Sequence, residues 1–439
     1  GHLRMSLVSF REYERIPVVD ALSSATERAF SVAEINQFDG LAARLRIPVI
    51  EHLSRTWVRP AQYVGTVRLA ARTVEFLPKI EHMEGVSDLP AVRHNLLRML
   101  LVAYDLDGAT PGQAALAKNS DGWLDLLMRL FCRALADQLR RGLIRRYREE
   151  CDDLLTVRGR LQIEEQLRRN LVHRERTACA FDEFDEDHAL NQLLRVAIVR
   201  MLRLASNNTT QQALRELLPA FEGVSDVAPM PDWLARVRLD RISERFGLCL
   251  GMARLFLQGA TTGLYAGDQN SFALLFDMND LFERFVARTL RRELRHSACQ
   301  VSIQDCRHHL VRELKSRQRL FRLRPDIVVS KGGLPLCVVD TKWKRLSPEE
   351  RKLGIAQGDL YQMLAYAEGY GCAAVLLIYP WAPAGGAHRS LRKRLVFEGG
   401  KQSTVTIGEL SLQDISAVGG RLAGLLEEAG VKLDKAVCA

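Results

Sequence analysis

The 439-residue chain lacks long apolar runs and paired cysteines, and each absence argues against a class of protein. A membrane-spanning helix needs about 18 to 20 consecutive apolar residues; the longest candidate, Ala373 to Ile378, is soon ended by Pro380. The nine cysteines form no C-x-x-C pair, so neither a disulfide framework nor a zinc ribbon is indicated. No charged segment followed by an apolar one stands near the N-terminus, so we expect a cytoplasmic protein.

The sequence also lacks the G-x-x-x-x-G-K-[S/T] motif of P-loop nucleotide hydrolases. The nearest segment, Gly399-Gly400-Lys401, has no leading glycine, so we expect the chain itself to bind no nucleotide. Hydrophobic residues make up 47% and charged residues 26%, which is typical of globular proteins and unlike disordered or collagen-like chains. At about 100 to 200 residues per domain, this length predicts two to four domains.

The hydrophobic patterning predicts an α+β or α/β multidomain protein with three parts. Residues 1–88 are rich in β-structure, with strands expected at 63–69 and 73–77. Residues 89–265 are mainly helical, because apolar residues recur there at three- and four-residue spacing. Residues 266–439 alternate helices with strands, which favours an α/β domain.

Finer features of these regions are also predicted from local signals. Asp187 is the expected N-cap of the helix that follows it, and the arginine-rich stretch 140–148 is interpreted as one solvated helix face. We expect a strand at 154–160, a linker at 261–270 and a helix at 348–369.

Two apolar strands joined by a glycine turn bring together residues that could carry chemistry. A Pro-Asp pair at Asp326 precedes the first strand, and the second ends in Asp340, Thr341 and Lys342. Side chains alternate along a strand, so Asp340 and Lys342 share a face. Two carboxylates beside an ammonium would form a site for a hard divalent cation, which could polarise a phosphodiester and activate water. The alternative is a surface hairpin with an incidental ion pair.

Predicted helices on either side of this hairpin supply three further candidates. Glu283 lies at the edge of an apolar stripe in a helix expected at 279–295, where it could add a third carboxylate or simply be solvated. Gln362 and Tyr366 are four residues apart and therefore share a helix face. They could contact a phosphate, orient the hairpin, or form an ordinary half-buried surface.

In this order, these elements resemble the PD-(D/E)XK nuclease superfamily. More specifically, the chain is similar to the McrC family, the nuclease subunits of McrBC-type modification-dependent (type IV) restriction systems. The further matching segments are Tyr63-Val64-Gly65, Leu77-Pro78-Lys79-Ile80, Arg158-Gly159-Arg160-Leu161, Phe181-Asp182-Glu183-Phe184, Asp187 with Asn191, Met278 to Glu283, and Asp359 to Gln362. The resemblance implies a restriction-endonuclease-like C-terminal domain and, before about residue 265, a partner-binding region.

The resemblance also implies roles for the candidate residues. The implied ligands of a Mg²⁺ or Mn²⁺ ion are Asp326, Asp340, the Thr341 carbonyl and Glu283. Lys342 would position or help deprotonate the attacking water and stabilise the transition state, while Gln362 and Tyr366 would support the site. Asp340 stands where the family more often has glutamate, and both are hard oxygen ligands.

Positive charge is concentrated near the expected metal hairpin. The formal net charge is +9, from 62 basic and 53 acidic residues. Residues 266–439 hold 26 of the basic and 19 of the acidic residues, a net of +7, and 307–324 alone has seven basic residues and one acidic. Phosphate contacts are therefore expected here. The expected DNA-binding residues are Arg317, Arg319, Arg322, Arg324 and Lys344.

The function implied by the resemblance is that of a Mg²⁺-dependent DNA endonuclease. It would cut modified double-stranded DNA in complex with a McrB-like AAA+ GTPase hexamer that recognises modified cytosine, and it would stimulate that GTPase. Two alternatives stay open: a nuclease that acts alone or with another helicase-like partner, and a non-catalytic adaptor that activates an AAA+ ring. No membrane partner is expected.

Overall fold

A computed structural model of the chain describes residues 7–21, 27–79, 89–106, 122–173, 175–228, 231–261, 272–347, 349–381, 390–398 and 402–433. Contacts divide the chain into two compact units: residues 1–123 with 266–439, and residues 124–265. The linker expected at 261–270 lies outside the described residues except for Thr261, as does Gly399-Gly400-Lys401. Among the described helices, none is long and apolar enough to cross a membrane.

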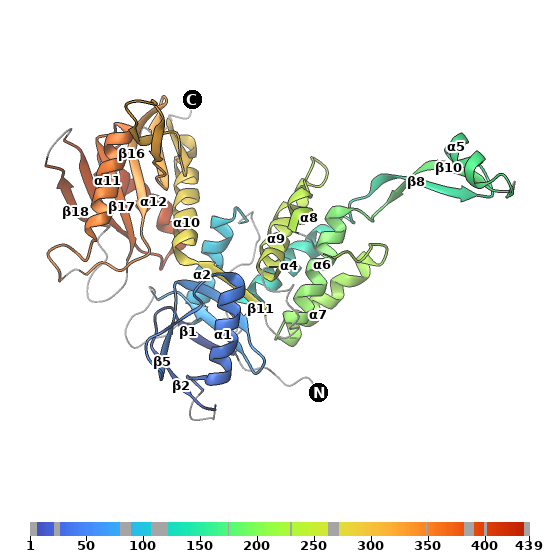
Figure 1. Cartoon of the computed structure of the whole chain (residues 1–439), viewed down its shortest axis with the longest axis horizontal. Helices are drawn as coiled ribbons and strands as arrows, with labels where there is room; N and C mark the ends of the chain where they lie inside the picture. Colours follow the sequence, from blue (N-terminus) through green and yellow to red (C-terminus); the bar gives the residue numbers. More distant parts are fainter. Residues whose placement is uncertain are drawn as a thin grey trace. The chain divides into compact units, whose positions relative to one another are not determined.

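The N-terminal part of the first unit packs two small sheets against helix α1, Val32–Leu45 (Figure 1). The strand orders are β1-β7-β6-β11 and β3-β2-β5-β4. Phenylalanine rings from both sheets and from α1 form the core, and Ser31 and Glu34 form a capping box at the start of the helix. The strands are β1 Leu7–Arg11, β2 Ile16–Val19, β3 Phe30–Ser31, β4 Ile50–His52, β5 Trp57–Pro60, β6 Tyr63–Arg68, β7 Thr73–Leu77 and β11 Phe272–Asp277.

Strands β6 and β7 confirm the two predicted N-terminal strands. The division into units shares the predicted boundary at 265/266, but its other boundary falls at 123/124 rather than at 88/89. Helix α2, Leu89–Ala103, belongs to the first unit because its Arg93 forms a buried ion pair with Glu75 of β7, with Nη2 and Oε2 2.8 Å apart. Strand β11 pairs antiparallel with β6, so it completes the N-terminal sheet.

The C-terminal part of the same unit is built on a six-stranded mixed sheet in the order β12-β15-β16-β17-β19-β18. Strands β16, β17 and β19 run parallel, and the remaining pairs are antiparallel. Helix α11 packs against the sheet through a buried cluster, while α10 and α12 contact each other and strands β16 and β19 (Figure 1). The expected mixture of helices and strands is confirmed.

Helix α10 confirms the helix expected at 279–295, but the other helix predicted in this part is shorter than expected. Helix α11 begins at Gln357 rather than near 348, because Leu353 and Gly354 adopt left-handed φ values of 56° and 71°. The elements are α10 Met278–Glu293, η4 Leu294–His296, β12 Cys299–Ile303, β13 His309–Arg312, β14 Arg319–Arg322, β15 Ile327–Lys331, β16 Leu334–Thr341, α11 Gln357–Tyr370, β17 Ala374–Pro380, β18 Leu391–Val396, β19 Thr404–Leu410, η5 Ile415–Ala417 and α12 Val418–Glu428.

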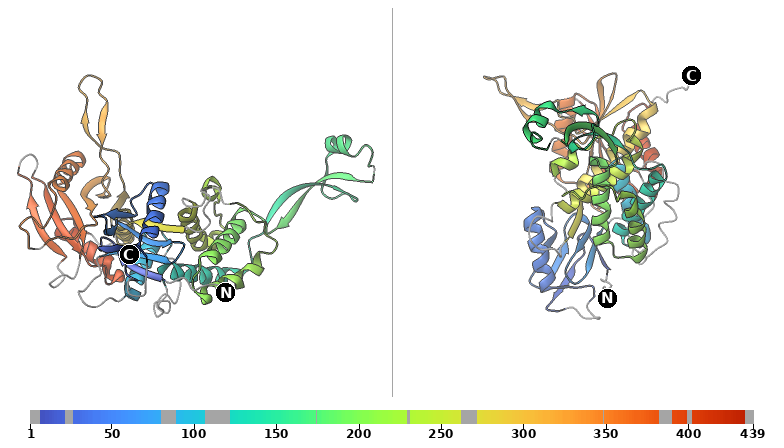
Figure 2. Two further views of the ribbon diagram at one scale, coloured as in Figure 1. Left: turned by 60° about the horizontal axis from the view of Figure 1, so that its bottom comes forward. Right: turned by 90° about the vertical axis from the view of Figure 1, so that its right-hand side faces the viewer.

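The second unit combines helices with a long hairpin formed by β8 and β10, which Figure 2 shows in green. Its predicted helical character is confirmed over most of its length, and β9 joins the hairpin as a third strand. The elements are α4 Trp123–Leu139, β8 Arg146–Leu154, β9 Arg160–Leu161, α5 Ile163–Arg169, β10 Thr177–Asp185, α6 Ala189–Leu204, α7 Asn208–Leu217, η2 Leu218–Phe221, α8 Pro231–Arg236, η3 Glu244–Phe246 and α9 Gly247–Thr261.

Three local predictions for this unit are wrong. The stretch 140–148 is not a helix face, because α4 ends at Leu139 and Gly142 turns the chain with a φ of 79° into β8. The strand expected at 154–160 is displaced, since β8 ends at Leu154. The N-cap of α6 is His188, and the Asp187 carboxylate instead accepts hydrogen bonds from Ser225 and Gln192.

The buried Arg93–Glu75 pair gives a stability prediction. Arg93→Leu leaves the Glu75 carboxylate buried without its guanidinium, which should cost about 3 to 5 kcal/mol of unfolding free energy. Arg59→Leu, which breaks a partly exposed pair with Glu51, should cost no more than about 1 kcal/mol. Urea denaturation of both variants measures the difference, and equal midpoints would contradict the central role of the buried pair.

Candidate active site

The hairpin β15–β16 places two aspartates side by side. Gly332 and Gly333 have φ values of 58° and 81°, as a type I′ turn requires, so the predicted glycine-turn hairpin is confirmed. The register pairs Ile327 with Val339. The residues that precede and follow this pair, Asp326 and Asp340, are therefore neighbours at the same end of the two strands.

Each aspartate has its own set of partners. Asp326 Oδ2 accepts hydrogen bonds from the backbone nitrogen and the hydroxyl of Thr341, at 2.7 and 2.8 Å. Asp340 is only 1% exposed, and its Oδ2 lies 2.7 Å from Lys342 Nζ. The strand alternation that predicted a shared face for Asp340 and Lys342 is therefore confirmed by their contact.

Helix α11 holds Lys342 from the side. Lys342 Nζ donates to Gln362 Oε1 at 3.1 Å, and Gln362 Nε2 donates to the Tyr366 hydroxyl at 2.9 Å. The Tyr366 hydroxyl in turn donates to the backbone carbonyl of Arg324 at 2.9 Å, two residues before Asp326. Gln362 and Tyr366 thus connect the lysine at the end of one strand to the chain entering the other.

Helix α10 brings Glu283 to the edge of the same site. Gln304, just beyond β12, donates from Nε2 to Glu283 Oε1 at 2.7 Å and accepts from the Arg324 guanidinium. Its backbone nitrogen also donates to the Asp326 carbonyl at 2.8 Å. Gln304 therefore links the third carboxylate to the hairpin. Nothing in the sequence marked Gln304 as part of the site.

Trp343 is a second residue that the sequence did not single out. It follows Lys342 directly, its ring centroid lies 5.2 Å from that of Phe282, and its Nε1 donates to the buried Glu12 at 2.8 Å. Phe282 is the neighbour of Glu283. The buried indole of Trp343 thus contacts the N-terminal sheet region through Glu12 and packs against Phe282. It lies next in sequence to Lys342, as Phe282 does to Glu283.

The electrostatics of the three carboxylates are set by burial and by their proximity. Burial raises the pKa of Asp326 to about 6, repulsion by Asp340 adds to the rise, and the hydrogen bonds from Thr341 oppose it. Burial also raises the pKa of Asp340. The pKa of Glu283 is raised by burial and then by the charge of Asp326. This end of the hairpin therefore carries more negative charge than the protein around it neutralises.

Lys342 responds in the opposite sense. Burial acts to lower its pKa, but the neighbouring Asp340 carboxylate outweighs burial, so the pKa of Lys342 is raised. The lysine is therefore an ammonium at neutral pH. A charged lysine can donate to a phosphate oxygen and stabilise negative charge, but it cannot accept a proton from water.

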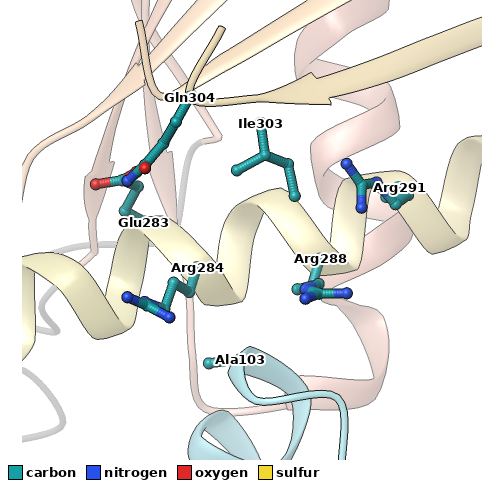
Figure 3. Close-up of a pocket in the computed structure, with 7 residues that line it drawn as sticks. All are labelled: Ala103, Glu283, Arg284, Arg288, Arg291, Ile303 and Gln304. Atoms are coloured by element: carbon teal, nitrogen blue, oxygen red, sulfur yellow. The ribbon is translucent and has the colours of Figure 1, made fainter. Parts of the chain in front are cut away.

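A cavity of about 250 Å³ opens beside Glu283 and Gln304 (Figure 3). Figure 3 shows three arginines of α10 around it: Arg284, Arg288 and Arg291. Arg284 pairs with Asp280 at 2.8 Å and Arg288 with Asp105 at 3.2 Å. The cavity thus continues the site from its acidic end onto a basic helix face.

The expected DNA-binding residues separate into three settings. Arg317, Arg319 and Arg322 lie in or between β13 and β14, outside the six-stranded sheet. Arg324 belongs to the site itself through Gln304. Lys344 is exposed, with Nζ 3.7 Å from Asp359 Oδ2.

The donor set suits a hard divalent cation. Asp326 and Asp340 are adjacent carboxylates with raised pKa values, and a cation between them would offset their repulsion. Within the described part of the chain, no three His, Cys, Asp or Glu side chains already stand grouped as metal ligands. Glu283 accordingly lies at the edge of a two-carboxylate site rather than inside a preformed triad.

Comparison with known proteins gives both a family and a fold. Over 96% of its length, the chain is similar to the whole of a chain from the Thermococcus gammatolerans assembly of McrB AAA+ hexamers with bound McrC, with a TM-score of 0.72 and 19% identity. A second match is to the Thermococcus gammatolerans McrBC complex: TM-score 0.52, 22% identity, 66% of this chain and 88% of that one. No curated protein matches the chain in sequence.

The structural likenesses show a shared fold, and the family follows from the sequence. Residues 58–380, which include both strands of the hairpin and both flanking helices, match the family model described as "McrBC 5-methylcytosine restriction system component". The chain belongs to the family of McrBC restriction system components.

Proposed function

We propose that the C-terminal part of the first unit is a PD-(D/E)XK-type nuclease domain that hydrolyses DNA phosphodiester bonds. The observation that carries the proposal is the contact of Lys342 with Asp340, at 2.7 Å, beside Asp326 on the neighbouring strand. A structural ion pair alone would not require a second, half-buried carboxylate at this position. An adaptor without catalytic function would have no need for either.

Asp326, Asp340, the Thr341 carbonyl and Glu283 would hold Mg²⁺ or Mn²⁺, which when bound supplies a Lewis acid for phosphate and water. The Lys342 ammonium, oriented by Gln362, would donate to a non-bridging oxygen of the scissile phosphate. The oxygen of a water molecule forms a bond to phosphorus while the bond to the leaving oxygen breaks. The proton of the water passes to solvent, and the leaving oxygen takes a proton in exchange.

The partner is proposed from the similar structures. In those, McrC is bound to McrB AAA+ hexamers. We propose that this chain likewise binds a McrB-like AAA+ GTPase hexamer and stimulates its GTP hydrolysis. The complex would then cut double-stranded DNA that carries modified cytosine, the partner recognising the modified site.

Reconstitution tests the whole proposal. Methylated and unmethylated duplex DNA are incubated with this chain and Mg²⁺, with and without a McrB-like GTPase and GTP. The expected result is cleavage only of methylated DNA and only with both partner and GTP. Cleavage that requires neither the partner nor GTP would instead support a stand-alone nuclease. Stimulation of the GTPase without any DNA cleavage would instead support a non-catalytic adaptor.

Substitutions at the hairpin test the catalytic site. Asp340→Ala removes a carboxylate and Lys342→Ala removes the only ammonium shown contacting it, so each should reduce the cleavage rate about 10²-fold or more. Lys352→Ala, which removes an exposed lysine, should cut normally. Stimulation of the partner GTPase by each variant reports whether the fold survives, and full cutting by either hairpin variant would refute the site.

The raised pKa of Asp326 predicts how stability depends on pH without metal. Folding lifts this pKa from 3.8 to about 6, so the stabilising contribution is present at low pH and is lost as the pH rises through 6. Asp326→Asn cannot ionise. In a chelator, the melting temperature of this variant should therefore exceed that of the wild type by more at about pH 8 than at about pH 5.

A matched control has the opposite sign. Burial acts to raise the pKa of Asp305, but its bonds with Arg307 outweigh burial and lower it. Asp305→Asn should therefore destabilise the protein increasingly as the pH rises. Mg²⁺ should raise the melting temperature of the wild type and not of Asp326→Asn. A pH-independent gap between Asp326→Asn and the wild type would contradict the electrostatic account.

A further inference from the structure

Strands β13 and β14 form a two-stranded ribbon outside the six-stranded sheet, and Figure 2 shows it in gold, projecting from the rest of its unit. Its base is fixed: the Leu323 nitrogen donates to the His308 carbonyl at 2.9 Å, and the His308 ring lies 4.3 Å from that of Tyr370. A two-stranded hairpin alone is marginally stable in water. Among the described residues, the hydrogen bonds of the distal part of the ribbon are those within its own two strands and turn.

The charges of this ribbon oppose its own folding. Arg312 and Arg319 stand directly opposite each other across the strands, an arrangement of like charges that destabilises a sheet. Within the described residues, no carboxylate lies within 4.0 Å of a basic group on the ribbon, and its single acid, Glu313, accepts a bond from the Ser316 hydroxyl. The ribbon's basic residues are Arg312, Lys315, Arg317, Arg319 and Arg322.

Apolar side chains lie exposed among these cations. Leu314 is 95% exposed and Phe321 is 74% exposed. Phe321 also has a φ of 55°, a left-handed conformation that is a genuine outlier for a bulky residue and tends to occur where a ligand is bound. On the facing strand, Leu310 lies between the paired residues His309 and Val311 and is half-exposed. The middle of the ribbon therefore presents an apolar spot bordered by guanidinium groups.

We propose that the β13–β14 ribbon binds in a groove of duplex DNA, with its basic side chains on the phosphates and Phe321 against the base edges. The major groove admits a two-stranded β-ribbon, and a duplex offers phosphates on both sides of an apolar interior. Only three residues separate Arg322 from Asp326, so DNA held by the ribbon lies beside the proposed metal ligands. The inference deepens the proposed nuclease function and rests on it for the identity of the polyanion.

Within the basic segment 307–324, the cations of the ribbon are better candidates for binding a polyanion than Arg307 and Arg324 are. Arg307 is paired with Asp305 at 2.5 Å, and Arg324 is bound to Gln304 within the site. Both are exposed, but each is already bound to a polar side chain of the protein. The five ribbon cations instead share an exposed surface with hydrophobic side chains, which suits a ligand having both phosphates and stacked bases rather than a free phosphate ion.

Salt dependence of DNA binding tests the proposal on the full chain without divalent metal. A plot of log affinity against log salt has a negative slope, to which each phosphate contact contributes about 0.9. The double variant Arg312→Ala/Arg319→Ala should therefore make this slope less steep by about 2. Arg295→Ala/Arg394→Ala, which removes the same charge from exposed positions outside the ribbon, should change the slope much less. Equal slopes for the two double variants would overturn the proposal.

Phe321 is tested separately because its contribution is not ionic. Phe321→Ala should weaken binding to a short duplex about tenfold with an unchanged salt slope, and Phe321→Leu should restore most of the loss. Melting temperatures of the variants check that the six-stranded sheet is intact. Wild-type affinity of Phe321→Ala would remove the groove contact from the proposal.

Comparing probes shows whether the ligand of the ribbon is DNA or another polyanion. Comparing binding with cleavage distinguishes a failure of the ribbon proposal from a failure of the nuclease proposal. Duplex DNA should bind more tightly than the same sequence as a single strand, heparin or polyglutamate. Preference for polyglutamate would assign the ribbon to an acidic protein partner instead. If ribbon variants lose duplex binding while the wild type never cuts with partner, GTP and Mg²⁺, the nuclease fails and the ribbon stands. Normal duplex binding by those variants alongside wild-type cleavage overturns only the ribbon.

Discussion

The repulsion between Asp326 and Asp340 is the interaction on which the rest of the candidate site depends. Burial raises the pKa of both carboxylates at the ends of these neighbouring strands, Asp340 being 1% exposed, and the charge of Asp340 raises the pKa of Asp326 further. The two aspartates have different partners. Thr341 donates hydrogen bonds to Asp326, and the ammonium of Lys342 contacts Asp340. Because one cation faces two anions, the balance remains negative, and a divalent cation is the simplest species that completes it.

The surrounding fold serves to keep these groups from moving apart. The tight glycine turn and the β15–β16 register bring the aspartates together, and α11 fixes Lys342 through Gln362. Trp343, the residue after Lys342, contacts both Phe282 of α10 and the buried Glu12 near β1. The strand that carries Asp340 is followed by this contact with the N-terminal sheet region, in keeping with the two parts forming one compact unit, although they were expected to be separate domains. Any shift of Glu12 must act on a residue directly bonded to Lys342.

Structural elements that depend on neighbouring residues in the sequence could be predicted. Contacts between residues far apart in the sequence could not. The hairpin was predicted because glycines at the turn and alternation along the strand are local signals, and the site residues on it follow directly. Gln304 reaches Glu283 across 21 positions, and Trp343 reaches Glu12 across 331, so no spacing rule could have found either. The wrong predictions have the same origin. Arginines at 140–148 suit a helix by propensity, but the pairing of β8 with β10 outweighs that preference.

Charge is otherwise balanced closely inside the first unit, as the buried pairs Arg93–Glu75 and Arg72–Glu34 illustrate. The strand-end site and the β13–β14 ribbon depart from that pattern in opposite directions, since carboxylates are in excess at the first and guanidinium groups at the second. They are joined by only a few residues of chain. A ligand that satisfies both must bring positive charge to the carboxylates and negative charge to the ribbon. Duplex DNA accompanied by a divalent cation does both at once, and neither component alone would.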